Sequence, residues 1–379
     1  MRILYFSSGS SVHDDQFLKK FSTSRHTFCF ASMHVHPLSV PAGIPYHYLG
    51  GDERRLPGQA GRALAAVQMF RRVRDLVRTW KPDLIHAGPA NTAGAIAAAI
   101  GFRPLLLMPW GTDILIVPRQ SLFGRLIVRR TINRADLITC DARVVRDRIV
   151  ELTGYPPDKI VVFPWGIDLE RFEPRESARQ TARAALGLTE GPVILMNRAH
   201  KPVYGIEFFL RALPRVLARV PEATAVIAGD GPLRESLISL ARELGLSSRA
   251  RFVGAVDNPS MPSLLHASNV YVSSSLSDGT SVSLLEAMAC GLPVVVSDLP
   301  SNREWVEPER GGLLVPPRDV DSLADAMVRV LTDHELSRAM GRRNLEIARE
   351  RADWNRNYAM LEEMYDTLGS RLQQGALSA

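Results

Sequence analysis

The chain has 379 residues, of which 46% are hydrophobic and 23% charged, so its composition is that of an ordinary globular protein and its length suits two domains. The three cysteines are far apart in the sequence and form no metal or redox pattern, which excludes a disulfide scaffold and fits a reducing, cytoplasmic compartment. Residues 1–170 hold 22 basic and 14 acidic side chains, whereas residues 171–379 hold 24 and 26. This asymmetry predicts two domains with different partners, the basic one facing something anionic.

The first half alternates short apolar runs, typical of buried strands, with longer segments of helical periodicity. The predicted strands are Ile3–Phe6, Thr27–Phe30, Leu84–His86, Leu105–Leu107, Leu137–Thr139 and Ile160–Val162, and the predicted helices are one starting at Asp14, Gly58–Trp80, Thr92–Ile100, Leu122–Asn133 and Val144–Leu152. Met1–Phe6 lacks the features of a signal peptide, and Arg103 interrupts the most apolar stretch. We therefore expect neither a signal peptide nor a helix that spans a bilayer.

The second half repeats this alternation after a linker or hinge over Pro164–Pro174. The predicted strands are Val193–Met196, Ala225–Ala228, Arg251–Val253, Val270–Val272, Val294–Val296 and Leu313–Val315, and the predicted helices are Ile206–Val220, Leu233–Leu244, Ser283–Ala289, Ser322–Leu331 and Glu335–Arg351. Such alternation predicts the α/β class, with two doubly wound Rossmann-like domains facing a central cleft. Ligands of such sheets bind beyond the carboxyl ends of the strands, so the loops that follow strands are the candidate sites.

Two glycine-containing loops follow predicted strands. Gly9 lies between the first strand and its helix, and Gly229 and Gly231 lie in Ala228–Leu233, which also opens a helix. Glycine lets a backbone come close to an anion, and a helix N-terminus favours negative charge. The first loop is equally well explained as an ordinary strand–helix turn, and the second is better explained as such a turn, capped by Asp230.

Arg198 directly follows another predicted strand, and Lys201 and Tyr204 lie nearby in the sequence. A guanidinium at this edge can bind a diphosphate through two parallel hydrogen bonds. The alternative is a surface ion pair of little energetic weight.

The most informative stretch is residues 273–293, where a polar loop leads from a strand into a helix that Gly291-Leu292-Pro293 ends. Asp278 lies in the loop, and Glu286 is expected in the first turn of the helix. The backbone amides from Gly279 through Thr280 and Ser281 to Val282 are expected to point toward an anion. In the alternative interpretation, Glu286 only completes a capping box with Ser283, and Asp278 is a plain turn residue.

This stretch resembles the donor-site signature of retaining glycosyltransferases of the GT-B fold, family 4 (glycosyl transferases group 1). That signature is an acidic residue followed by a glutamate that leads into a helix ending Ala-Met-Ala-x-Gly-x-Pro. The resemblance extends over nearly the whole chain, because further family segments fall in the expected order: Pro164–Asp168, Arg198, Gly229–Leu233, Phe252–Gly254 and Gly312–Val315.

The resemblance implies an architecture and a role for each matching residue. It implies an acceptor-binding domain over residues 1–165, a nucleotide-sugar domain over residues 166–353, and a last helix, about 354–379, that packs back on the first domain. Glu286 would hold the ribose hydroxyls, and the loop from Asp278 to Ser281 the donor sugar. Arg198 would bind the diphosphate. Phe252, Val253 and Gly254 would lie near the base, chiefly through backbone contacts.

The sequence departs from the family pattern at four places. Asp278 replaces a glutamate, and Tyr204 replaces a lysine whose charge Lys201 would have to supply. Trp110, followed by Gly111 and Asp113, replaces a histidine on the acceptor side, where the indole ring could stack on a sugar. Gly9 stands alone where the family has two glycines in a row.

Eight basic residues and one acidic residue lie between Arg54 and Lys81, in a segment with helical periodicity. The basic residues are Arg54, Arg55, Arg62, Arg71, Arg72, Arg74, Arg78 and Lys81. An amphipathic basic helix can lie on anionic lipid headgroups, which predicts a peripheral membrane protein on the cytoplasmic face. The alternative is a solvated helix packed on the sheet. No nucleic-acid-binding motif accompanies the charge, so nucleic acid is not expected as a partner.

Taken together, these patterns predict a hexosyltransferase that moves a sugar from a nucleoside-diphosphate sugar to a sugar, lipid-linked or other hydroxyl acceptor. The reaction is expected to retain the anomeric configuration and to need neither a metal nor a cofactor. Arg198, Lys201 and helix N-termini would stabilise the leaving diphosphate. Asp278 would serve as a sugar ligand or as a nucleophile. Two alternatives remain at this point: a sugar-nucleotide epimerase of the same fold, and a non-catalytic binding relative.

Overall fold

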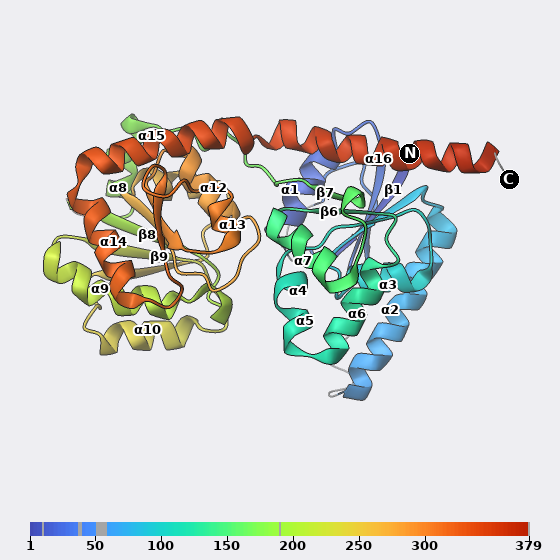
Figure 1. Cartoon of the computed structure of the whole chain (residues 1–379), viewed down its shortest axis with the longest axis horizontal. Helices are drawn as coiled ribbons and strands as arrows, with labels where there is room; N and C mark the ends of the chain where they lie inside the picture. The colour runs from blue at the N-terminus through green and yellow to red at the C-terminus, as the bar shows by residue number, and fades with distance from the viewer. Residues whose placement is uncertain (10, 37–39, 51–58, 189–190, 378–379) are drawn as a thin grey trace. The chain divides into compact units, whose positions relative to one another are not determined.

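The computed structural model describes residues 1–9, 11–36, 40–50, 59–188 and 191–377. The chain forms two compact units, one made of Met1–Phe163 with Tyr358–Ala379 and the other of Pro164–Asn357. Each unit is an α/β domain built on a parallel sheet, which confirms the predicted fold class (Figure 1).

Unit 1 contains a seven-stranded parallel sheet in the order β3-β2-β1-β4-β5-β6-β7. Its strands are β1 (Arg2–Ser7), β2 (Thr27–Ser32), β3 (Tyr46–Tyr48), β4 (Leu84–Ala87), β5 (Leu105–Leu107), β6 (Leu137–Cys140) and β7 (Ile160–Val162). Its helices before the linker are α1 (Val12–Phe21), α2 (Gln59–Trp80), α3 (Ala93–Ile100), α4 (Thr112–Leu115), α5 (Val117–Gln120), α6 (Leu122–Ile132) and α7 (Arg143–Thr153).

Side chains that alternate along β1 separate the two faces of this sheet. Leu4 and Phe6 pack with Met69 and Val73 of α2, on the face that α2 and α3 cover. Tyr5 points to the other face, where its ring lies 5.1 Å from that of Phe21 on α1. Both faces are therefore buried, as expected for a parallel sheet.

The last helix, α16 (Trp354–Leu377), packs on unit 1 from Tyr358 onward (Figure 1). The Tyr365 hydroxyl lies 2.8 Å from Nδ1 of His86 on β4, and both side chains are fully buried. Burial lowers the pKa of His86 to about 3, so its imidazole is neutral at neutral pH. The helix thus completes the hydrophobic covering of the β1–β4 part of the sheet.

Unit 2 contains a six-stranded parallel sheet in the order β10-β9-β8-β11-β12-β13. Its strands are β8 (Val193–Asn197), β9 (Thr224–Ala228), β10 (Ala250–Gly254), β11 (Val270–Ser273), β12 (Val294–Ser297) and β13 (Gly312–Val315). Its helices are α8 (Glu176–Ala185), α9 (Ile206–Arg219), α10 (Arg234–Glu243), α11 (Met261–His266), α12 (Val282–Ala289), α13 (Pro300–Arg303), α14 (Val320–Thr332) and α15 (His334–Arg351).

The strand order of unit 2 reverses direction between β8 and β11, which are hydrogen-bonded neighbours. The chain runs outward from β8 to β10 on one side and from β11 to β13 on the other. Loops at the carboxyl ends of these two central strands therefore diverge, and such a switch point is where doubly wound sheets bind ligands.

All twelve predicted strands exist, each with bounds within one residue or two of the prediction. Two predicted helix starts are shifted by two residues: α1 begins at Val12 instead of Asp14, and α14 at Val320 instead of Ser322. Several others, such as α12, which begins at Val282 instead of Ser283, are shifted by one residue. The sequence patterns did not predict β3, α8 and α11 or the short helices α4, α5 and α13.

Candidate functional site

The guanidinium of Arg198 is the centre of a polar cluster at the switch point of unit 2. Arg198 follows β8 directly and is 8% exposed. Its Nη2 lies 2.5 Å from Oδ2 of Asp278, and its Nη1 donates to the hydroxyls of Ser281 and Ser283, the latter at 3.1 Å. The structure therefore brings together residues that lie 80 to 85 positions apart in the sequence.

Burial and the ion pair act in opposite directions on the two charges of this cluster. Burial raises the pKa of Asp278, and the neighbouring Arg198 limits the rise. Asp278 in turn keeps the pKa of Arg198 above its ordinary value, in spite of burial. The guanidinium is thus a fixed positive charge at the carboxyl end of the sheet.

Two tyrosines hold Arg198 in place. The ring centroid of Tyr204 lies 4.1 Å from Cζ of Arg198, in a cation–π contact. The hydroxyl of Tyr271, on β11, lies 2.8 Å from the Ser283 hydroxyl that accepts from Arg198. Tyr204 is the residue that replaces the family's lysine. Its ring covers the guanidinium of Arg198 at a position where the family pattern has a second positive charge. The sequence did not predict this role.

Helix α12 begins beside this cluster, with Ser281 as its N-cap. The Ser281 side chain accepts from the amide of Leu284, so the alternative interpretation, a capping box of Ser283 with Glu286, is not what the structure shows. Glu286 lies in the second turn rather than in the first. The N-terminal amides of α12, next to Gly279 and Thr280, leave donors available for an anion.

Glu286 is a buried carboxyl, 7% exposed, surrounded by apolar residues of α12 and its neighbours. Burial raises its pKa to about 8, and the positive charge of Arg171 only partly offsets this effect. Besides burial, only the charge of Arg171 acts on the Glu286 carboxyl, and its helix is capped by Ser281, so helix capping does not account for Glu286. Such a buried carboxyl is suited to bind hydroxyl groups of a ligand.

Gly229 and Gly231 pack tightly against the loop that carries Arg198. A Cβ on Gly229 would lie 2.2 Å from the carbonyl oxygen of Arg198, and one on Gly231 would lie 2.7 Å from that of His200. Both glycines also have positive φ, +119° and +154°. A larger residue at either position would therefore clash with protein backbone. The packing of the protein itself explains both glycines, without any contact to a ligand. Asp230 accepts from the amide of Gly231 and does not cap α10, contrary to the expectation.

His200 is a further buried side chain of this loop that the sequence analysis did not single out. Its ring lies edge-on to that of Phe252, with centroids 6.0 Å apart, and burial lowers its pKa. Neither ring nitrogen has a hydrogen-bond partner within the described residues. The sequence feature that could have pointed to His200 is its position, two residues after Arg198 in the same loop.

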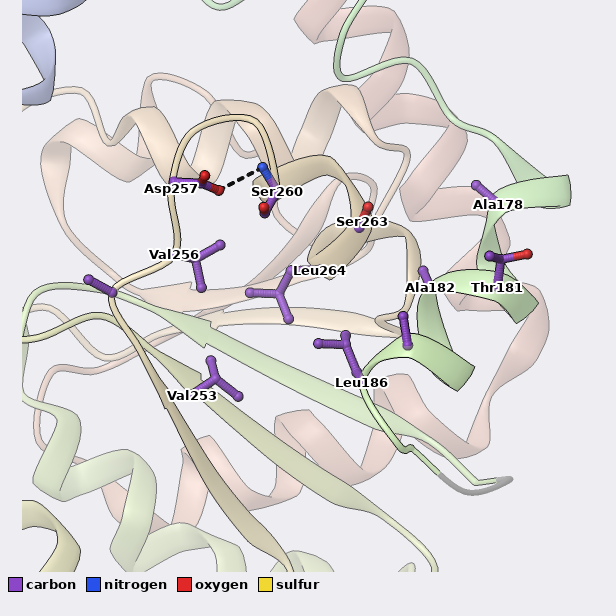
Figure 2. A pocket seen from close by; sticks show the side chains of 12 residues that line it. Ala178, Thr181, Ala182, Leu186, Val253, Val256, Asp257, Ser260, Ser263 and Leu264 are labelled. Carbon is purple, nitrogen blue, oxygen red and sulfur yellow. Dashed lines mark hydrogen bonds between the residues drawn. The ribbon is translucent and has the colours of Figure 1, made fainter. Parts of the chain in front are cut away.

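The predicted base-binding segment ends β10 at the edge of the sheet. Gly254 has a φ of +77° and its carbonyl accepts from the amide of Gly229 at 2.7 Å. Val253, 40% exposed, lines a hollow of about 890 Å³ between α8, the segment 253–257 and α11 (Figure 2). The wall of this hollow is mostly apolar and includes Leu186 and Leu264 (Figure 2). Lys201, by contrast, is exposed and starts the short turn before α9.

The remaining predicted site residues lie in unit 1. The Asp113 carboxylate accepts from the amides of Ala90 at 2.6 Å and Trp110 at 2.9 Å, and burial raises its pKa to about 6. Trp110 is partly exposed, and its ring meets that of His13 edge-on at 5.9 Å. Gly9 has a φ of +82°, and a Cβ there would lie 2.4 Å from Cβ of Ser32. Asp113 and Gly9 therefore have structural roles within the loops.

Comparison with protein families matches residues 191–333 to the model described as glycosyl transferases group 1 and residues 26–171 to that of glycosyltransferase family 4. The chain belongs to glycosyltransferase family 4. The first matched range lies in unit 2 and the second lies mostly in unit 1, so both units of this family 4 chain carry the resemblance.

Curated relatives of this family 4 chain are glycosyltransferases. A GDP-mannose-dependent alpha-(1-6)-phosphatidylinositol monomannoside mannosyltransferase of Mycolicibacterium smegmatis is 29% identical over 287 residues, which cover 73% of this chain and 74% of that protein. A D-inositol 3-phosphate glycosyltransferase of Nocardia farcinica is 31% identical over 304 residues, which cover 77% of this chain but 63% of that protein. Neither relative is an epimerase, so the epimerase alternative gains no support.

Solved structures show the GT-B fold. The Anabaena HepE protein in complex with UDP-glucose has a TM-score of 0.82 at 22% identity and covers 97% of this chain and 100% of its own. Sucrose-phosphate synthase from Thermosynechococcus elongatus has a TM-score of 0.83 at 18% identity, covering 98% of this chain and 100% of its own. The predicted GT-B architecture is confirmed.

Proposed function

We propose that this chain transfers a hexose from a nucleoside-diphosphate sugar to an acceptor hydroxyl with retention at the anomeric carbon. The observation that carries the proposal is the cluster of Arg198, Asp278 and Ser281 beside a buried Glu286 at the start of α12. This cluster combines a fixed cation, helix amides and a hydroxyl-binding acid. Those are the groups that a diphosphate attached to a ribose requires.

Each group has a distinct task in the proposed reaction. Arg198 and the first amides of α12 bind the diphosphate and stabilise the negative charge that develops as the bond from the anomeric carbon to the phosphate oxygen breaks. Glu286 accepts hydrogen bonds from the ribose hydroxyls. The acceptor oxygen attacks the same face of the sugar, and its proton passes to the leaving phosphate oxygen.

We assign Asp278 the role of a sugar ligand rather than a nucleophile. Its carboxylate is neutralised by a guanidinium 2.5 Å away, which lowers its electron-donating power. Positive charge from Arg198, Lys201 and the helix N-terminus suits a metal-independent mechanism, because these groups supply the electrostatic stabilisation that a bound cation otherwise gives.

For the donor, we propose GDP-mannose as the first candidate, with the base against Val253 and Gly254. Support comes from the relative in Mycolicibacterium smegmatis, a GDP-mannose-dependent enzyme at 29% identity. For the acceptor, we propose a lipid-linked alcohol at the cytoplasmic face of a membrane, with Trp110 on the acceptor side. The same relative acts on a phosphatidylinositol monomannoside. Within the described residues no helix is long and apolar enough to cross a membrane, so contact with lipid would be peripheral.

The experiment is a transfer assay with GDP-mannose, UDP-glucose and ADP-glucose, using extracted lipids as acceptors. We expect transfer from one donor, an α-linked product by NMR, and undiminished activity in the presence of EDTA. If a donor is hydrolysed but no sugar is transferred, the assignment of a lipid-linked acceptor is wrong. If no donor is turned over at all, the chain is better explained as a non-catalytic binding protein. A β-linked product from an α-linked donor would refute retention.

A further inference from the structure

Helix α6 of unit 1 presents large apolar side chains to solvent. Leu122, Phe123 and Leu126 are 84%, 73% and 64% exposed, more than almost any other large apolar residue of the described chain. They lie within one turn of the helix, so they form a single patch. We call the exposed side of this helix the α6 surface; it consists of Leu122, Phe123, Arg125, Leu126, Arg129 and Arg130.

The opposite side of α6 anchors the helix in the core. Val128 and Ile132 are buried in the cluster that includes Ile138 of β6 and Ile149 of α7. Ser121 caps the helix by accepting from the amide of Gly124 at 2.9 Å. The exposed apolar side chains therefore project from a firmly packed helix.

The charged side chains of α6 around this patch are all positive. Between Asp113 and Asp136 the sequence contains five arginines and no acidic residue. Arg125, Arg129 and Arg130 are exposed on the same side of α6 as Leu122 and Leu126. The acid that influences Arg125 from a neighbouring helix is Glu151 on α7, and Glu151 already pairs with Arg148 at 2.7 Å. Apolar side chains flanked by unneutralised arginines suit an anionic lipid surface.

Helix α2, the site predicted from sequence for lipid contact, is less suited to this role. Its apolar residues Met69, Val73 and Leu76 are buried against the sheet, so they cannot also contact lipid. Arg54 and Arg55 lie outside the described residues, and the side chain of Arg62 is not described either. The alternative interpretation, a helix packed on the sheet, is the one that the structure supports.

We propose that the α6 surface docks unit 1 on an anionic bilayer, with the three apolar side chains in the headgroup–acyl boundary and the three arginines at lipid phosphates. This inference rests on the proposed function in one respect, that the acceptor is lipid-linked. A two-fold dimer through the same patch is disfavoured, because it would bring six arginines together without an acid to pair with them.

The test is sedimentation of the full chain with vesicles of phosphatidylcholine alone or with about 30% phosphatidylglycerol. We expect binding to the anionic vesicles that weakens at high salt. Replacing Leu122, Phe123 and Leu126 by Ser should lower the partition coefficient at least about tenfold. Arg125→Gln with Arg129→Gln and Arg130→Gln should lower it about tenfold on anionic vesicles and leave binding to neutral vesicles unchanged.

The matched control replaces three exposed arginines of α2, Arg71, Arg74 and Arg78, by Gln. This variant has the same net charge as the α6 arginine variant, so we expect a loss below about threefold. An equal loss in the control, or full binding by the serine variant, would overturn the proposal. So would a wild-type dimer that ignores vesicles and becomes monomeric in the serine variant.

Two further readouts separate this inference from the proposed function. Unchanged thermal unfolding shows that a variant is folded. Hydrolysis of the sugar nucleotide needs no lipid, so we expect both α6 variants to retain the wild-type rate. Vesicle binding without any turnover would contradict the proposed function alone, whereas turnover without vesicle binding would contradict the docking surface alone.

Discussion

Replacing Glu286 with Gln should stabilise the folded protein in a pH-dependent way while impairing donor binding. The pKa of Glu286 rises from 4.5 to about 8 on folding, because its carboxyl is buried. Between these values the folded state holds a proton that the unfolded chain has released. The stability that this group contributes is therefore complete below pH 4.5 and is lost as the pH rises toward 8.

The magnitude follows from the difference between the two pKa values. One pKa unit corresponds to about 1.4 kcal/mol, so at pH 7 the carboxyl costs roughly 3 kcal/mol relative to a neutral group. Gln keeps the shape but does not ionise. At about 2–4 °C per kcal/mol for a domain of this size, the unfolding temperature of the variant should exceed that of the wild type by several degrees at pH 8. The difference should vanish near pH 4.5.

Calorimetric unfolding temperatures between pH 4.5 and 8.5 test this prediction, with Glu243→Gln on the exposed side of α10 as the control. The control should show no pH-dependent difference from the wild type. In addition, nucleotide-induced stabilisation should be weaker in Glu286→Gln at pH 8.5, where the wild-type carboxyl is mostly ionised, because the amide cannot accept from two ribose hydroxyls as a carboxylate does. A difference in unfolding temperature that is constant across pH, or an unchanged response to nucleotide, would refute the reasoning.

Substitutions at Tyr204, Gly229 and Asp113 test the roles assigned to other residues. Tyr204→Leu should lower kcat about tenfold and Tyr204→Phe should keep it, because the ring and not the hydroxyl covers Arg198 at 4.1 Å; equal rates in both variants would contradict this. Gly229→Ala should destabilise by more than about 3 kcal/mol in denaturant unfolding, whereas Gly245→Ala, with positive φ but open space around it, should cost about 1 kcal/mol. Asp113→Asn should lower the unfolding temperature, since an amide group would oppose the backbone donors of Ala90 and Trp110; normal stability with a raised KM for the acceptor would instead support a direct role in acceptor binding.

The strands were predictable because a parallel strand buried on both faces is a continuous apolar run, as in Val294–Ser297. The edge strand β3, Tyr46–Tyr48, escaped prediction because its short, half-exposed sequence lacks such a run. Helix α8 escaped because its sequence is polar and lacks a wide apolar stripe.

For the site, the sequence predicted which loops could bind a ligand but not which of their side chains meet. Arg198 and Asp278 both follow predicted strands, which placed them in candidate ligand-binding loops. The ion pair, the covering ring of Tyr204 and the N-cap at Ser281 depend on side-chain geometry across segments far apart in the chain. Periodicity also cannot say which face of a helix is covered, so it pointed to α2 for membrane contact, whereas the exposed apolar side chains lie on α6.

The most direct test of the central claim is the rate of sugar transfer by Arg198→Ala beside that of the wild type. If Arg198 stabilises the departing diphosphate, kcat falls at least about a hundredfold, while circular dichroism shows that the fold is kept. Transfer at the wild-type rate by the folded variant would contradict the assignment of the site.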